Sequence, residues 1–194
     1  MPLLIFTFIM NEIKLYATML TILFVISCIA GFYFANENPK LAKKTIEQLF
    51  SQFEFIKNMN PSLIFLLIFL NNSIKALVAM LAGFLFGLFP VLFVILNGYL
   101  IGLVIQIKGM EMGFKKIALA LIPHGIVEIP AIIIACSYGI WLGRRFWNAI
   151  NGKEKFRNAV FFALKKYLRI VLPMLIVAAI IETFVTPYIA FAFS

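Results

Sequence analysis

Apolar runs and short polar segments alternate along the chain. A helix needs roughly 20 predominantly apolar residues, with a range of about 17–25, to cross the bilayer core. Five runs reach this length, at residues 15–34, 63–88, 91–107, 117–142 and 168–190. The short alternating segments of a membrane β-barrel do not occur. The pattern predicts an all-α, polytopic helical membrane protein with about five transmembrane helices, forming a single integral membrane domain over residues 1–194.

Two segments between the spans are predicted to form amphipathic helices at the membrane surface. Residues 40–58 follow a break at Asn36-Glu37-Asn38-Pro39 and have mixed charge with apolar residues at helical spacing. The second helix is predicted at 146–167, within a segment, 144–169, that holds eight Lys/Arg against one Glu. The first 14 residues fit either a short interfacial helix or a ragged start of the first span.

Prolines and glycines mark breaks in and between the spans. Phe89-Pro90 predicts a tight turn that makes spans two and three an antiparallel hairpin, and residues 108–116 predict a short basic loop. Within the fourth span, Pro123, Gly125 and Pro130 weaken the helix, because proline lacks the N–H that helix hydrogen bonding needs. These three residues predict either one kinked span or two re-entrant halves.

Composition and charge exclude a soluble domain. Hydrophobic residues make up 63% of the chain and charged residues 13%, whereas soluble domains carry about 25% charged residues. The net charge of +9 predicts contact with anionic lipid of the bilayer and no nucleic acid, since no basic stripe lies on a separate domain. The positive-inside rule applied to residues 144–169 predicts a multi-pass protein of the cell membrane with a cytoplasmic N-terminus.

Small residues recur every four positions on three of the predicted spans. Such faces let helix backbones approach closely, so that van der Waals contact drives association. We interpret them chiefly as internal packing faces, and three faces leave room for a homodimer seam as well. The glycines assigned to them are Gly83, Gly87, Gly98, Gly102, Gly139 and Gly143.

Seven polar residues are predicted at membrane depth, where an isolated charge costs about 2.5–3.5 kcal/mol on insertion scales. His124 is the only histidine, and Glu128 follows at i+4, so both face the same way on an intact helix. Lys75 could pair with Glu128 or Glu182. The cluster predicts either a polar network that fixes helix register or a functional site for a cation, protons or a lipid headgroup. Its members are Asn71, Asn72, Lys75, Asn97, His124, Glu128 and Glu182.

The sequence lacks the common catalytic motifs. It contains no H-E-x-x-H, no G-x-S-x-G and no phosphate-binding glycine loop. One histidine and no aspartate cannot form the usual zinc site unless two carboxylates join it. Cys28 and Cys136 are single residues in apolar spans and predict neither a disulfide nor a metal framework. We therefore expect no enzyme, no metal and no cofactor.

With these residues in place, the chain resembles the stage II sporulation protein M family from about residue 65 onward. Pro123-His124-Gly125-x-x-Glu128-Ile129-Pro130 is the most specific part of the resemblance. Asn71-Asn72, Asn97-Gly98-x-x-x-Gly102, Gly139-x-x-x-Gly143 and Glu182 near Thr186-Pro187 support it. The resemblance implies a multi-span protein without established catalysis. The sporulation member is a scaffold that recruits cell-wall hydrolases to the septal membrane, and relatives outside sporulation have no defined role.

Two functions follow as hypotheses. The first is a non-enzymatic membrane scaffold or assembly factor, as a homodimer and with a membrane-associated protein as partner. The alternative is a small transporter or channel that uses the polar cluster for an ion, protons or a lipid. A membrane enzyme with a His/Glu site is a weaker third reading. A cavity that reaches the cluster would favour transport, whereas a dry and fully paired cluster would remove its main support.

Overall fold

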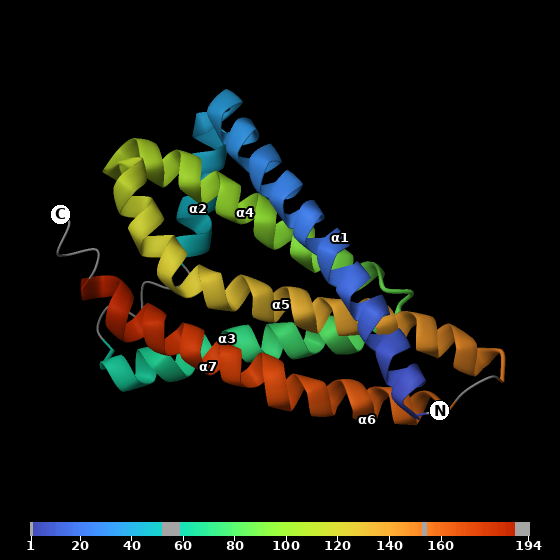
Figure 1. Ribbon diagram of the computed structural model, residues 1–194. Coiled ribbons are helices and arrows are strands. Elements are labelled where there is room, and N and C mark those ends of the chain that lie inside the picture. Colours follow the sequence, from blue (N-terminus) through green and yellow to red (C-terminus); the bar gives the residue numbers. More distant parts are fainter. Residues whose placement is uncertain (1, 52–58, 153–154, 189–194) are drawn as a thin grey trace.

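The structure is a computed structural model that describes residues 2–51, 59–152 and 155–188, with side chains from residue 7 onward. These residues form helices and turns, without strands. Helices long and apolar enough to cross a membrane cover Thr7–Glu37, Pro61–Phe84, Leu88–Met112, Phe114–Ile150 and Phe156–Tyr188. The prediction of an all-α, polytopic membrane protein is confirmed, and Figure 1 shows the helices packed as a bundle.

The helices follow one another with short connections. Elements η3 and η4 are π-helices and η2 is a 3₁₀-helix. The bounds are α1 (Pro2–Glu37), α2 (Pro39–Ser51), α3 (Pro61–Leu81), η2 (Ala82–Phe84), α4 (Leu88–Met112), α5 (Phe114–Ile150), α6 (Phe156–Lys166), η3 (Tyr167–Val171), α7 (Leu172–Ile180) and η4 (Ile181–Val185).

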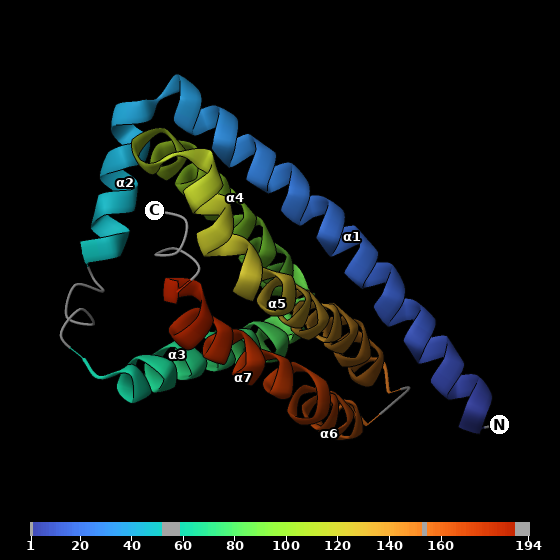
Figure 2. The same ribbon diagram turned by 60° about the vertical axis from the view of Figure 1, so that its left-hand side comes forward.

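The N-terminal stretch belongs to the first span, because α1 is one uninterrupted helix of 36 residues. After Asn38 the chain turns into α2, which lies across the end of α1 and α4 (Figure 2). α2 buries Ala42 and Ile46 in a cluster with Leu103 and Ile107 of α4. The predicted amphipathic helix at 40–58 is therefore a helix from its start, while residues 52–58 lie outside the described part of the chain.

The turn between the second and third spans lies before Phe89-Pro90, so that prediction is wrong by a few residues. α3 ends at Leu81, η2 follows, and Gly87 with φ 73° makes the turn into α4. Pro90 lies in the first turn of α4, where its missing N–H has no intrahelical partner to lose. The antiparallel hairpin itself is present. At the other end of α3, Asn60 caps the helix by accepting a hydrogen bond from the Leu63 N–H at 2.9 Å.

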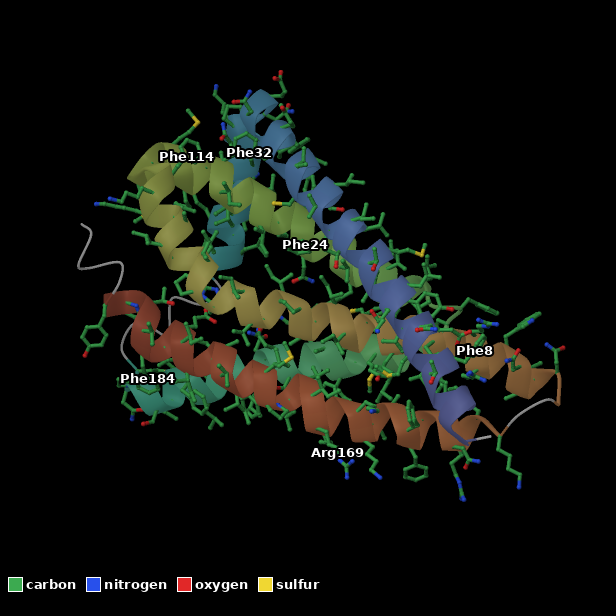
Figure 3. All side chains as sticks on the ribbon, viewed as in Figure 1. Phe8, Phe24, Phe32, Phe114, Arg169 and Phe184 are labelled. Carbon is green, nitrogen blue, oxygen red and sulfur yellow. The ribbon has the colours of Figure 1, made fainter. Side chains whose placement is uncertain are left out.

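The predicted basic loop at 108–116 is also corrected, because Gly113 alone separates α4 from α5. Gly113 has φ 94° and ψ 135°, a conformation that glycine adopts with little strain. The helical residues before it are held by an ion pair in which Lys108 Nζ lies 2.7 Å from Glu111 Oε2. Next to this turn the rings of Phe32 and Phe114 pack 6.4 Å apart (Figure 3).

The fourth span is one helix and not a re-entrant pair. α5 runs from Phe114 to Ile150 with Pro123 and Pro130 inside it. Its yellow part, which contains this stretch, descends and then bends into the long golden part (Figure 1). A bend at this place has an identifiable cause, since each proline removes one hydrogen bond to the carbonyl four residues earlier.

The second amphipathic helix, predicted at 146–167, is divided in the structure. Its first residues continue α5 to Ile150, and the chain turns at Asn151 and Gly152. The rest is α6, which runs without interruption through η3, α7 and η4 into the last span. The basic segment is thus the water-side extension of two membrane helices rather than a separate helix on the surface.

Both π-helices end two residues before a proline, Pro173 or Pro187. Proline offers no N–H to the carbonyl four residues earlier, which here belongs to Arg169 or Thr183 inside the π-helix. In a π-helix the backbone N–H bonds to the carbonyl five residues earlier instead of four, so other N–H and carbonyl groups are paired than in an α-helix. The second of these segments carries Glu182.

All six of the assigned glycines lie where two helical elements of this chain touch. A Cβ on Gly98 would lie 2.6 Å from the carbonyl oxygen of Phe24 in α1. A Cβ on Gly83 would lie 2.6 Å from the Cα of Gly139, and one on Gly143 would lie 2.7 Å from the amide nitrogen of Gly87. The small-residue faces therefore serve contacts of α4 with α1 and of α5 with the end of α3, within one chain.

Figure 2 shows how these contacts shape the molecule. α1, α4 and the long part of α5 run together, and α3 runs with α6 and α7. The two groups meet where α1 begins and α5 ends, and they diverge toward the end that carries α2. At the end where they meet, Ile13 of α1 shares a buried cluster with Trp141 of α5 and Ala163 of α6.

Candidate intramembrane ligand site

A cavity of about 810 Å³ lies between α3, α4 and α5, on the side where the two groups of helices diverge. Its walls are mainly apolar, with Phe24 from α1, Phe50 from α2 and leucine, isoleucine and valine side chains from α3, α4 and α5. Six polar residues also line the cavity. They are Asn71, Asn72, Asn97, His124, Glu128 and Glu182, which are six of the seven that the sequence placed in a polar cluster.

His124, Glu128 and Glu182 form a close group of ionisable side chains in this cavity. One side-chain nitrogen of His124 and one carboxylate oxygen of each glutamate all lie within 4.8 Å of one another. Because α5 is continuous, His124 and Glu128 stand one turn apart on the same face. Glu182 comes from the π-helix η4, which contacts both α3 and α5. All three side chains are half-buried.

The asparagines contribute amide groups from two further helices. The Asn71 side-chain amide donates to Asn72 Oδ1 at 3.2 Å, and the Asn97 side-chain amide donates to its own helix at the Phe93 carbonyl, 2.7 Å away. All three asparagines line the cavity, so the side-chain donors and acceptors that these two hydrogen bonds leave unused are available there. The cavity therefore offers acceptors and donors beside the three ionisable groups.

Lys75 is the member of the predicted cluster that lies elsewhere. Its side chain is exposed, and it does not line the cavity. It exerts an electrostatic attraction on Glu128, but among the described residues no salt bridge joins it to Glu128 or Glu182. In the described part of the chain, neither carboxylate forms a salt bridge with a lysine or an arginine.

Local backbone breaks explain why polar groups remain available here. Pro130 has no N–H for the carbonyl of Ile126, and Pro187 has none for the carbonyl of Thr183. The hydroxyl oxygens of Thr183 and Thr186 and the Nδ1 of His124 are buried without a hydrogen-bond partner among the described residues. A buried polar group without a partner is costly, and of these residues His124 lines the cavity, so its Nδ1 fits a ligand that supplies the missing contact.

The chemistry of the site changes one expectation from the sequence. A single histidine needs two carboxylates to complete a metal site, and the structure brings Glu128 and Glu182 to His124. The same group can also pass protons, or hold a polar head while the apolar walls take a hydrocarbon tail. The geometry thus accommodates binding of a cation, of protons or of a small amphiphile.

Sequence reasoning missed an ion-pair group at the other end of the molecule. Arg144 Nη1 donates a hydrogen bond to Glu12 Oε1, and Arg145 Nη2 lies 3.7 Å from Glu12 Oε2. Glu12 is buried, and the Arg145 guanidinium lies over the Trp141 ring at 5.0 Å. A glutamate just before an apolar span and an arginine pair just after another were the available signal, but only the fold places them together.

Two further contacts were missed for different reasons. The Tyr167 hydroxyl donates to the carbonyl of Ser73 at 2.7 Å and ties the last helix to α3, a pairing with no sequence signal. Gly31 of α1 packs on α4, where its Cβ would lie 3.1 Å from the Cα of Tyr99. Its signal was present, since Ser27-x-x-x-Gly31 has the same small-residue spacing as the other faces.

Comparison with known proteins assigns the chain to a family. Residues 20–187 match the SpoIIM family, described as Stage II sporulation protein M. Two proteins of Methanocaldococcus jannaschii are similar to it. Uncharacterized protein MJ0793 is 30% identical over 87% of this chain and 92% of its own length, and uncharacterized protein MJ0706 is 29% identical over 66% of this chain and 58% of its own length. No solved structure matches the chain. The match includes part or all of each of the five membrane helices, and the chain belongs to the stage II sporulation protein M family.

Proposed function

We propose that the protein is a small transporter or channel of the cell membrane that takes up its ligand in the cavity between α3, α4 and α5. The observation that carries this proposal is the gathering of six polar side chains around a cavity of about 810 Å³. A polar network that only fixed helix register would be filled and paired by neighbouring side chains. No catalytic step is part of this function.

Volume and depth of the cavity both support transport. Ligand pockets have volumes of about 300–1,000 Å³, and this cavity falls within that range. Asn71 and His124 each lie ten residues from the start of their helix, roughly 15 Å along it and near the middle of a 30 Å core. A substrate site near the bilayer midplane is the arrangement that many secondary transporters use.

The proposal is tested by ion flux into liposomes that contain the purified protein. Uptake of H⁺, Na⁺, K⁺ and Mn²⁺ is measured for the native chain, for Glu128→Gln and for Glu47→Gln. The matched control carries the same chemical change on the exposed face of α2. We expect uptake of at least one of these ions, reduced about tenfold or more by Glu128→Gln and unchanged by Glu47→Gln. Equal uptake in the two variants, or no uptake above that of empty liposomes, would reject the transporter.

A second function, a homodimeric membrane scaffold, is favoured by the outer face of α1. Its exposed apolar side chains follow one another at intervals of four and three residues, the heptad spacing at which two helices pack side by side. The opposite face of α1 already packs on α4. The stripe consists of Leu15, Met19, Ile22, Ile26, Ile29 and Tyr33. A second copy of the chain along this stripe would form an α1–α1 seam.

Disulfide crosslinking in native membranes tests this seam. We expect Ile26→Cys to give a crosslinked dimer, because the two copies of this residue would face each other across the seam. Ile74→Cys is the matched control, equally exposed but on α3. The native chain, with Cys28 and Cys136 inside its spans, gives the background. Crosslinking of both positions to the same extent, or of neither, would argue against the seam.

A further inference from the structure

We propose that His124, Glu128 and Glu182 bind a divalent transition-metal ion inside the membrane. The ion would lie in the cavity assigned above to transport, and this deepening of the site rests on that function for its physiological role. The three residues offer one imidazole nitrogen and two carboxylate oxygens from α5 and η4. These three side chains are the protein ligands of the proposed site.

Distances between the ligand atoms are close to those of a metal site. Metal–nitrogen and metal–oxygen bonds are about 2.0–2.2 Å long, so three atoms arranged around one ion lie about 3–3.8 Å from one another. The three atoms here lie within 4.8 Å of one another. Small side-chain rotations close the difference, because His124 and Glu128 already share one helical face.

A second observation is the state of the histidine. The Nδ1 atom of His124 is buried and has no hydrogen-bond partner among the described residues. An imidazole nitrogen left without a partner in a low-dielectric setting loses the stabilisation that either a donor or a metal ion would supply.

Charge balance also favours a divalent cation. Two carboxylates a few ångströms apart repel each other strongly in a medium that screens little. Lys75, which attracts Glu128 electrostatically, is exposed and makes no salt bridge with either glutamate in the described part of the chain. A doubly charged ion bound by two carboxylates and a neutral imidazole gives a site with no net charge, which is the form that costs least at membrane depth.

The ligand set selects the class of ion. Imidazole and carboxylate together suit Zn²⁺, Mn²⁺, Fe²⁺ and related ions, whereas Mg²⁺ and Ca²⁺ prefer oxygen ligands alone. Three protein ligands leave further coordination positions open to water. An incompletely coordinated ion can be released, so the open positions fit an ion that is carried rather than one that is held for structure.

Equilibrium binding to the full chain in detergent tests the site without any measurement of transport. The protein is stripped with a chelator, incubated with Zn²⁺, desalted and analysed for zinc. We expect about one zinc ion per chain, held against excess Mg²⁺, with affinity reduced about tenfold or more in Glu128→Gln and Glu182→Gln. Glu47→Gln, the matched control on α2, should bind as the native chain does.

X-ray absorption on the zinc-loaded native chain gives a readout that needs no variant. A shell of nitrogen and oxygen with one imidazole supports the site, whereas a sulfur ligand would assign the zinc to a cysteine and overturn it. Absence of bound zinc, or zinc bound equally by Glu128→Gln and the native chain, would also overturn it. Zinc binding without ion flux would reject transport and support the metal site. Flux of another ion without zinc binding would support transport and reject the metal site.

Discussion

At the residue scale, glycines of this chain have two different environments. Gly102 lies where α4 touches α1, and its Cβ would lie 2.7 Å from the amide nitrogen of Phe32 and would overlap the Cys28 carbonyl. Gly125 lies in the bent part of α5, where a Cβ would meet only Ile129 Cδ1, at an ordinary contact distance of 3.6 Å. Spacing in the sequence identifies the first kind of glycine, and only the structure identifies the second.

These environments predict opposite responses to a single methyl group. Gly102→Ala forces α1 and α4 apart and should destabilise the chain by about 1–3 kcal/mol, the usual range for overpacking. Gly125→Ala should leave stability unchanged or raise it by at most about 1 kcal/mol, because alanine is the better helix former. Thermal unfolding in detergent measures both. A destabilised Gly125→Ala beside an unaffected Gly102→Ala would contradict the helix contacts described above.

The buried Glu12 carboxylate gives a second prediction at this scale. Glu12→Gln removes the charge that pairs with Arg144 and Arg145. Arg144 is half-exposed, so water moderates the loss, and we expect a cost of about 1–3 kcal/mol. Glu111→Gln is the control, since Glu111 pairs with Lys43 and Lys108 near the surface of the opposite end and should change thermal stability little. Equal effects of the two variants would show that the buried ion pair of Glu12 contributes no more to stability than the surface ion pairs of Glu111.

The environment of a residue could be predicted from the sequence only where its partners lie near it in the chain. Six of the seven polar residues share the cavity, because their depth in each span follows from sequence position. Lys75 does not, since it precedes the buried Ala76 by one residue and is turned about 100° from that face. The approach of Glu182 to His124 brings together residues 58 positions apart and has no local signal.

At the element scale, helix existence was predicted well and helix ends were not. Apolar length alone predicts the five spans, and Asn60-Pro61 predicts the start of α3. Phe89-Pro90 predicts a helix end, but α4 begins before it, because proline is well tolerated in a first turn. The charged residues at 108–116 predict a loop, but Lys108 and Glu111 pair along the surface of α4. In both places the turn is made by a glycine with positive φ, Gly87 or Gly113.

Gly113 therefore allows a test of the α4–α5 connection. With φ 94° and ψ 135° it lies in a region that residues with a Cβ rarely adopt, although no atom lies within 4 Å of a Cβ built there. Gly113→Ala should cost about 1–3 kcal/mol through backbone strain alone. Thermal unfolding is the measurement, with Met112→Ala as the control, because Met112 is exposed at the end of α4. A cost no greater than that of the control would mean that the turn relaxes freely.

At the scale of the whole molecule, three helices extend to the same end of the bundle. α1 begins there, α5 ends there and α6 begins there, and their side chains form one buried cluster. Basic residues that the sequence placed on a surface helix are carried by this extension. The cavity lies toward the other side, where α2 covers the ends of α1 and α4. Amino-acid spacing predicts the number of crossings, but the divergence that opens the cavity depends on how α3 and α4 pack on α5.

The orientation of the protein in the membrane gives a further prediction, because five crossings place the two ends of the chain on opposite sides. The end of α5 and the start of α6 lie at the same end of the molecule as the start of α1, and α2, which ends at Ser51, lies toward the opposite end. Residues 144–169 hold eight lysines and arginines, so we expect their side to be cytoplasmic. In intact cells a membrane-impermeant maleimide should then label Ser51→Cys and spare Asn151→Cys until the cells are opened. Labelling of Asn151→Cys from outside, with Ser51→Cys protected, would reverse the orientation and place the mouth of the cavity toward the cytoplasm.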